Sequence, residues 1–265
     1  MSLRDFFTIY AAALRLGANK VLQYRGDSVI AAVGEATIQS AALVGVVTIA
    51  SVAGGGIGGW GLHNIVLLYS FFLMVRAIAQ ALFDGVWNIG NVYIRAGRLD
   101  LLLVRPVSPF FQLICNRFEF TSFGFFFLGI GMSIWSLSRL GIGFSIGLLC
   151  IYVLFVICGV ILTTSLYLIF NGLNFWLVQG NEITQVMLNV QEFSKYPLHV
   201  FPVAVQVLLT FIIPFSVTTY YPTAVLTGHM GPLAVLYLLM VTAVFAFIAS
   251  LVWRLGLKSY NSTGS

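Results

Sequence analysis

The chain has 265 residues, of which 60% are hydrophobic and only 8% are charged, and its mean hydropathy is +1.00. Soluble globular domains carry about 25% charged residues, so this composition excludes that class and predicts an integral membrane protein. The net charge of +5 does not indicate a nucleic-acid partner, because the Lys and Arg residues form no stripe with polar neighbours.

The first 28 residues predict an amphipathic helix on the membrane surface. Four basic residues alternate there with apolar ones such as Phe6, Phe7 and Leu14, a pattern typical of interfacial helices. A helix that merely leads into the first span is compatible with the same pattern. The basic residues are Arg4, Arg15, Lys20 and Arg25.

Apolar runs near the roughly 20 residues needed to cross hydrocarbon predict an all-α polytopic membrane protein with one domain over residues 1–265. Asn171 and Gly172 offer a place to end the long fourth run, and the polar segment 175–199 predicts an interfacial helix or an extension of that run. Six spans put both termini on one side. The predicted spans are about 29–50, 62–83, 118–137, 142–170, 200–221 and 232–254, followed by a tail over 255–265.

Two ionisable residues fall inside the first two predicted spans, where charge is costly and therefore functional by default. Glu35 follows the start of the first span by six residues, and Arg76 precedes the end of the second by seven, so antiparallel helices place both at one depth. We predict that they pair or share a network. The pair either fixes how the spans dock or belongs to a translocation path; alternatively, Arg76 simply extends its charge towards the interface.

The segment "RAGRLDLLLVRPVSP", residues 95–109, predicts a compact basic projection between the second and third spans. A short helix ending before Pro106 would place Arg95, Arg98, Leu102 and Arg105 along one side, with Leu103 adjacent. The alternative is an ordinary positively charged loop that anchors to lipid headgroups.

Tyr220, Tyr221 and Pro222 lie near the end of the fifth predicted span, before "TAVLTGHMGP". They predict a short break or re-entrant turn over a pore, which would make them candidates for an outer gate. An interfacial belt of aromatic residues is the alternative. No catalytic constellation is present, and neither the three histidines nor the three cysteines show metal-ligand spacing, so we predict no metal site.

Orientation follows from the loops, since Lys and Arg concentrate on the cytoplasmic side of membrane proteins. Eleven of these residues fall in the N-terminal segment, the 84–117 loop, 171–199 and the tail, against Arg139 alone on the opposite side. Both termini and residues 95–109 are therefore predicted to be cytoplasmic, and the glycine tract Gly54 to Gly61 is predicted to be an outward turn.

The segment 95–109 resembles the loop between the second and third spans of type-2 ATP-binding-cassette (ABC) exporter permeases of the short six-span branch. "YPTAVLTG", from Tyr221, and "WRLGLKSYNSTGS", from Trp253, are similar to the same family. In that family the loop couples the permease to an ATPase subunit. The resemblance implies charged contacts at Arg95, Arg98 and Arg105, an orienting acid at Asp100, an apolar anchor at Leu102 and Leu103, and a helix stop at Pro106.

The resemblance further implies a permease in the bacterial cytoplasmic membrane, in contact with lipids, which forms half of a translocation pathway. A second permease, identical or homologous, would complete the pathway, and two copies of an ATPase subunit would carry ATP and Mg. The sequence contains no GxxxxGK[ST] segment, so we expect that this chain is no enzyme and binds no cofactor.

Few intramembrane charges favour a hydrophobic or amphipathic substrate such as a drug, a lipid or a lipid-linked product. Two other function classes stay open. A secondary transporter or channel would work without nucleotide and would more often show inverted repeats. A non-transporting membrane scaffold would show no substrate flux.

Overall fold

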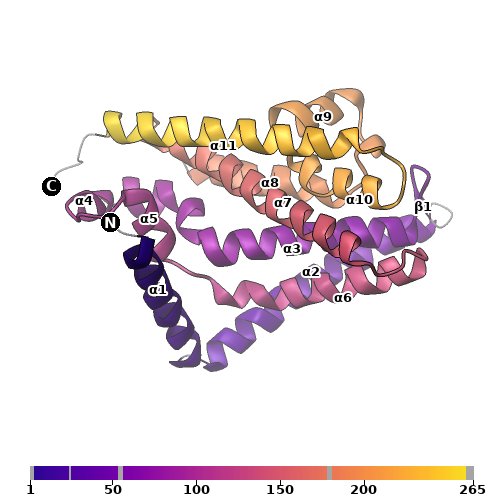
Figure 1. Cartoon of the computed structure of the whole chain (residues 1–265), viewed down its shortest axis with the longest axis horizontal. Helices are drawn as coiled ribbons and strands as arrows, with labels where there is room; N and C mark the ends of the chain where they lie inside the picture. Colours follow the sequence, from indigo (N-terminus) through magenta and orange to yellow (C-terminus); the bar gives the residue numbers. More distant parts are fainter. Residues whose placement is uncertain (1–2, 24, 53–55, 178–180, 261–265) are drawn as a thin grey trace.

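The protein is an all-α bundle whose long helices run along its longest axis, as the computed structural model in Figure 1 shows; it describes residues 3–23, 25–52, 56–177 and 181–260. Within those residues, five helices are long and apolar enough to cross a membrane. Their cores are α2 (Arg25–Val52), α3 (Leu62–Trp87), α6 (Phe123–Arg139), α7 (Ile146–Gly172) and α11 (Leu233–Ser259).

Shorter elements gather at the two ends of the bundle, which we call the α4 end and the β1 end (Figure 1). The α4 end carries α1 (Leu3–Gln23), η1 (Ile89–Ile94), α4 (Leu99–Leu103), α5 (Pro109–Cys115), η2 (Phe120–Ser122) and η3 (Leu173–Phe175). The remaining elements are β1 (Gly56–Ile57), β2 (Trp60–Gly61), α8 (Asn181–Glu192), η4 (Phe193–Lys195), η5 (Leu198–Val200), α9 (Val203–Val207), η6 (Leu208–Ile212), η7 (Phe215–Thr218) and α10 (Tyr220–Leu226).

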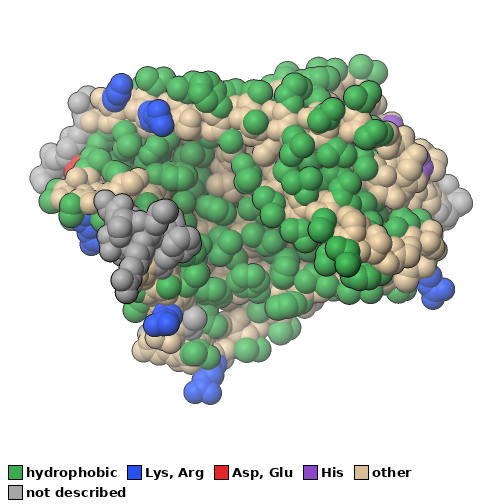
Figure 2. Space-filling model, in the orientation of Figure 1, with side chains coloured by type: hydrophobic (Ala, Val, Ile, Leu, Met, Phe, Trp, Pro, Cys, Tyr) green, Lys and Arg blue, Asp and Glu red, His purple; other side chains and the backbone are tan. Residues whose placement is uncertain are grey.

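Apolar side chains cover the visible side of the bundle, while Lys and Arg gather towards its two ends (Figure 2). This distribution is the one that a lipid bilayer requires, because hydrocarbon contacts the sides and water contacts the ends. The surface therefore supports the membrane assignment made from composition.

Helix α3 is the central element, buried on nearly all sides by α2, α6 and α7. Close packing depends on small residues at the crossings. A Cβ on Gly129 of α6 would meet Met74 at 2.7 Å, and one on Gly159 of α7 would meet Val75 at 2.6 Å. Small residues at such crossings are the usual means of bringing membrane helices together.

Gly85 of α3 faces the backbone of α5, where an added Cβ would collide with the Leu113 carbonyl oxygen. We expect Gly85→Ala to lower the free energy of unfolding by about 1–3 kcal/mol, because a backbone contact cannot be relieved by a rotamer change. The measurement is unfolding in mixed micelles. Gly131→Ala is the control, since its Cβ would meet nothing within 4 Å; equal losses in both variants would contradict the packing argument.

The connection from α6 to α7 follows local sequence rules. Gly141 adopts φ +70°, its N–H donates to the Ser138 carbonyl (3.3 Å), and the Ile142 N–H donates to the Leu137 carbonyl (3.1 Å). This is a Schellman ending, which favours glycine. Ser145 then caps α7 by accepting a hydrogen bond from the Leu148 N–H (3.0 Å).

The β1–β2 hairpin forms the turn predicted for the glycine tract. Gly58 and Gly59 have φ values of +57° and +83°, which only glycine adopts readily, and Ile57 pairs with Trp60. Residues 54–55 of the tract lie outside the described residues.

The predicted span 200–221 is not one continuous helix. Residues Val203–Ile212 and Phe215–Leu226 form two arms bent by 71°. Pro214 lies at the break, where it supplies no backbone N–H and disrupts helical continuity. Both arms connect at the β1 end, since His199, before the first arm, and His229, after the second, lie 5.7 and 5.3 Å from the Trp60 ring. The two arms therefore form a re-entrant pair, which enters the bundle from the β1 end and returns to the same end.

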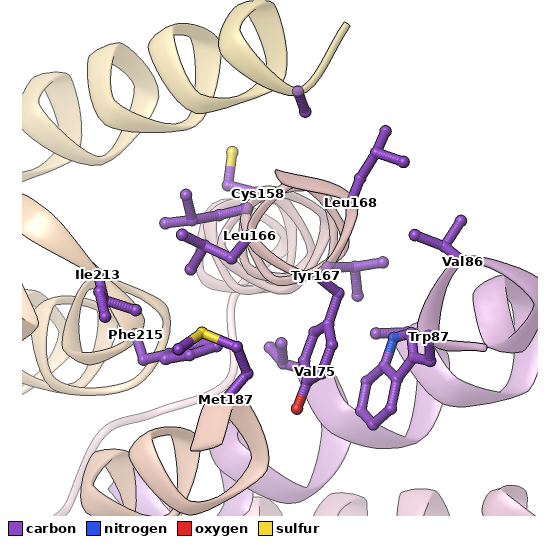
Figure 3. Close-up of a cluster of buried hydrophobic side chains, with 14 of the residues drawn as sticks. Val75, Val86, Trp87, Cys158, Leu166, Tyr167, Leu168, Met187, Ile213 and Phe215 are labelled. Atoms are coloured by element: carbon purple, nitrogen blue, oxygen red, sulfur yellow. The ribbon is translucent and has the colours of Figure 1, made fainter. Parts of the chain in front are cut away.

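The deepest part of this re-entrant pair packs in the middle of the bundle. Phe215 is fully buried, with its ring 6.2 Å from that of Tyr167 in α7. Figure 3 shows Phe215 and Ile213 beside Met187 of α8 and the α7 side chains. The apolar character of 200–221 therefore reflects burial among helices as well as exposure to lipid.

The polar segment 181–199 runs between the two ends of the bundle, with one face of α8 exposed. Near the α4 end, Thr184 Oγ1 donates to Asn171 Oδ1 (2.5 Å). Farther along, the Tyr167 hydroxyl donates to Gln191 Oε1 (2.9 Å), and His199 reaches Trp60 at the β1 end. Neighbouring helices satisfy Thr184 and Gln191, whereas Glu182, Gln185 and Asn189 are exposed. Hydropathy did not predict the passage because the segment is polar.

The other predicted spans are helical, with ends that differ by a few residues. The first helix begins at Arg25, and the last continues to Ser259, so half of the predicted 255–265 tail is helix; basic Lys258 suits the negative end of its dipole. Residues 261–265 lie outside the described residues. The predicted N-terminal helix is present as α1, and its position on the membrane surface stays a prediction.

Candidate functional site

The predicted coupling segment, residues 95–109, projects from the α4 end as the short helix α4 and its flanks (Figure 1). Gly97, at φ +64°, turns the chain from η1 into α4. The helix ends at Leu103, before Pro106, as predicted. Arg95, Arg98 and Arg105 are all exposed.

The predicted apolar anchor is partly wrong. Leu102 is 3% exposed and packs, together with the fully buried Leu99, into the protein's own core. Residues three apart share one helix face, so these two leucines hold α4 down. The exposed apolar side chains are Leu101, Leu103 and Val104, of which only Leu103 was predicted; Val104 is 86% exposed.

Gln112 of α5 holds the coupling segment in its bent path. Its side chain is buried, and Nε2 donates to the carbonyl oxygens of Leu102 (2.9 Å) and Val107 (2.7 Å). The first bond satisfies a carbonyl that the short helix leaves without an intrahelical partner, and the second satisfies one in the loop that follows. The sequence analysis missed this residue, because a single glutamine in a loop carries no spacing signal.

Asp100 faces the end of α11. It lies by Tyr260, where burial and then the negative charge of Asp100 raise the pKa of the tyrosine. Both effects disfavour the phenolate, so Tyr260 stays neutral at physiological pH. The C-terminal helix is thereby linked to α4, and the predicted role of Asp100 as an orienting acid is still a prediction.

Helix α1 lies against α5, beside the coupling segment. The Tyr10 ring is 5.8 Å from Phe118 and 6.5 Å from Phe111. The contact joins the N-terminal helix and the coupling segment in one surface at the α4 end.

The predicted pair of Glu35 and Arg76 is wrong. Arg76 Nη1 donates to Glu192 Oε1 at 2.5 Å, and Lys195 also pairs with Glu192. Both cations lie over the Phe72 ring, at 5.7 and 5.1 Å from its centroid. Glu35 instead accepts a hydrogen bond from Gln39 Nε2 at 3.3 Å.

The reason for the error is the passage of 181–199 through the bundle, which brings Glu192 to the depth of Arg76. The depth argument itself agrees with the structure, because Glu35 and Arg76 line the same cavity. Only the identity of the ion-pair partner of Arg76 could not be inferred without the tertiary structure.

This polar cavity, of about 850 Å³, lies between α2, α3, η2 and α8. Helix α3 supplies Arg76, Gln80 and Asp84 at intervals of four residues, so they share one helix face. That spacing within an apolar run is a sequence signal that was not used. Asp84 pairs with Arg117 and accepts from Asn88 Nδ2 at 3.1 Å. The ionisable side chains of the lining are Glu35, Arg76, Asp84, Arg117 and Glu119.

The predicted outer-gate residues lie at the start of α10, the returning arm of the re-entrant pair. Tyr220 stacks on Trp60 at 4.8 Å, Tyr221 lies 5.2 Å from Tyr237 of α11, and Pro222 is buried. His199 and His229 also contact Trp60. The arm is thus fastened to the β1–β2 hairpin and to α11, and gating stays a prediction.

Comparison with known proteins gives one family. A family model described as ABC-2 family transporter protein matches residues 36–264. The match includes the coupling segment, the re-entrant pair and the lining of the polar cavity except Ala31 and Glu35, which precede it. Searches of curated proteins and of solved structures found no significant match.

Proposed function

Because the chain belongs to the ABC-2 transporter family, whose membrane proteins are permease components that work with an ABC ATPase, we propose that it is the permease subunit of an ATP-driven exporter. The ATPase, with its ATP and Mg, is a separate subunit present in two copies. A second permease, identical or homologous, completes the pathway.

The observation that carries this proposal is the exposed surface of the coupling segment. Arg98 and Arg105 flank the exposed side chains of Leu101 and Val104, on a helix held from behind by two buried leucines. Apolar contact within a charged rim is the usual composition of a protein interface. A rigid base behind the contact would pass movement of the ATPase to α3 and α5.

We propose that the protein lies in a bacterial cytoplasmic membrane with its α4 end facing the cytoplasm. Arg139 lies at the β1 end, whereas α1, the coupling segment and the end of α11 supply basic residues at the other end. Lys195, which the sequence analysis counted as a loop residue, is buried and carries no orientation signal. The bias remains strong without it.

The test is gentle affinity purification from native membranes, followed by mass spectrometry and an ATP hydrolysis assay. We expect an ATPase to co-purify, and we expect Val104→Asp combined with Arg98→Glu to reduce its retention about tenfold or more. Burying an unpaired carboxylate and reversing a rim charge both oppose association.

Arg139→Glu is the matched control, since it makes the same charge reversal at the opposite end. It should retain the ATPase at the level of the unmodified chain. Purification of the chain without any ATPase would contradict the exporter proposal. Assays of flux driven by an ion or substrate gradient would then be the next test.

A further inference from the structure

The polar cavity contains hydrogen-bonding groups that the described residues leave without partners. Gln80 Oε1, Trp87 Nε1 and Arg76 Nε are buried atoms of side chains that line it, and none has a hydrogen-bond partner among those residues. Trp87 is only 7% exposed. An unpartnered polar atom away from water costs free energy, so three around one cavity indicate a space that polar groups occupy. Gln80 Oε1 can accept a hydrogen bond from a cation, whereas the two N–H groups donate and require an acceptor such as water.

The charges around the cavity favour a cation. Asp84 pairs with Arg117, and Arg76 shares Glu192 with Lys195. Glu35 accepts a hydrogen bond from Gln39 and has no Lys or Arg partner among the described residues. A carboxylate inside a membrane bundle without a counter-ion attracts one.

Apolar surface adjoins this carboxylate. Val29, Ile30 and Val33, within two turns of Glu35 on α2, are 61%, 72% and 60% exposed. Ala31, also exposed, lines the cavity itself. A ligand with its polar end in the cavity can therefore lay an apolar chain along α2.

We propose that the polar cavity binds the ammonium or guanidinium group of an amphipathic cation, with Glu35 as its counter-ion and Gln80 Oε1 as a further acceptor. The inference rests on the proposed function, in that the cation is the exporter's substrate. It narrows the substrate from amphipathic molecules in general to those with a nitrogen cation.

The experiment uses the complete complex with its ATPase in nanodiscs of phosphatidylglycerol. This lipid carries no ammonium group, so no headgroup competes with the probe. Equilibrium binding is measured for dodecylammonium, with dodecanol and dodecanoate as neutral and anionic probes of equal chain length, after subtraction of binding to empty discs. We expect dodecylammonium to bind at least tenfold more tightly than either, and to change the ATP hydrolysis rate.

Glu35→Gln should weaken dodecylammonium binding about tenfold, the order expected for losing a hydrogen bond to a charged group, while leaving dodecanol binding unchanged. Asp27→Asn is the matched control, because it removes one exposed carboxylate from the same helix outside the cavity. It should bind and hydrolyse ATP like the unmodified complex.

Equal binding of dodecylammonium and dodecanol, or binding that survives Glu35→Gln, would overturn the proposal. So would binding without any change in ATP hydrolysis, since that is the behaviour of a resident lipid amine. A complex that hydrolyses ATP but binds no cation would contradict this inference alone, whereas a chain that recruits no ATPase would contradict the proposed function.

Discussion

Glu192→Ala should lower the free energy of unfolding by about 3 kcal/mol, the lower end of the range for breaking a buried ion pair. The Arg76 and Lys195 side chains are 14% and 10% exposed, so both cations would remain in the bundle without a carboxylate. The Glu192 side chain itself is 39% exposed, which limits the loss. Unfolding in mixed micelles, followed by circular dichroism, gives the value.

Two further variants make the result specific. Glu182→Ala removes an exposed carboxylate from the first turn of the same helix and should leave stability within about 0.5 kcal/mol of the original. Adding Arg76→Met to Glu192→Ala should recover part of the loss, because one fewer cation is left unpaired. A double variant less stable than Glu192→Ala would contradict the ion-pair explanation.

Phe215→Ala should lower the free energy of unfolding by about 3–5 kcal/mol, the usual range for a large aromatic side chain removed from a core. Phe215 is fully buried at the turning point of the re-entrant pair, against Tyr167 and directly after Pro214. The neighbouring backbone is fixed by the Ser216 hydroxyl, which donates to the Leu209 carbonyl (2.6 Å), so the cavity cannot close easily. The same micelle unfolding experiment measures the loss.

Phe211→Ala is the control, because Phe211 belongs to the other arm and is 63% exposed. It should change stability by less than about 1 kcal/mol. If both variants lost stability equally, the 203–226 segment would not be anchored in the bundle, and a simple fifth span would explain the data better.

Composition and apolar run length predicted the membrane class and the helices at the first, second, third, fourth and sixth predicted spans, because lipid demands about 20 apolar residues from any helix that contacts it on several sides. They failed at residues 181–226 for one reason. Apolar run length contains no information on tertiary contacts. The polar helix α8 passes between the ends with one face packed and the other exposed, and the apolar re-entrant pair turns back at Pro214.

The candidate sites show the same division. The length of α4, its exposed arginines and its end before Pro106 were readable from residues 95–109, because they depend on local helix and proline geometry. That Leu102 faces inward and Val104 outward depends on α5 and its Gln112, which lie beyond local sequence.

By itself, the sequence determined what each segment can be: its apolarity, its helical face, its turn residues and the depth of Glu35 and Arg76, all of which are local properties. Only the tertiary structure decided which groups meet. The pairing of Arg76 with Glu192 joins residues 116 positions apart. That choice leaves Glu35 without a cation among the described residues, because a buried charge takes the partner that packing brings within reach.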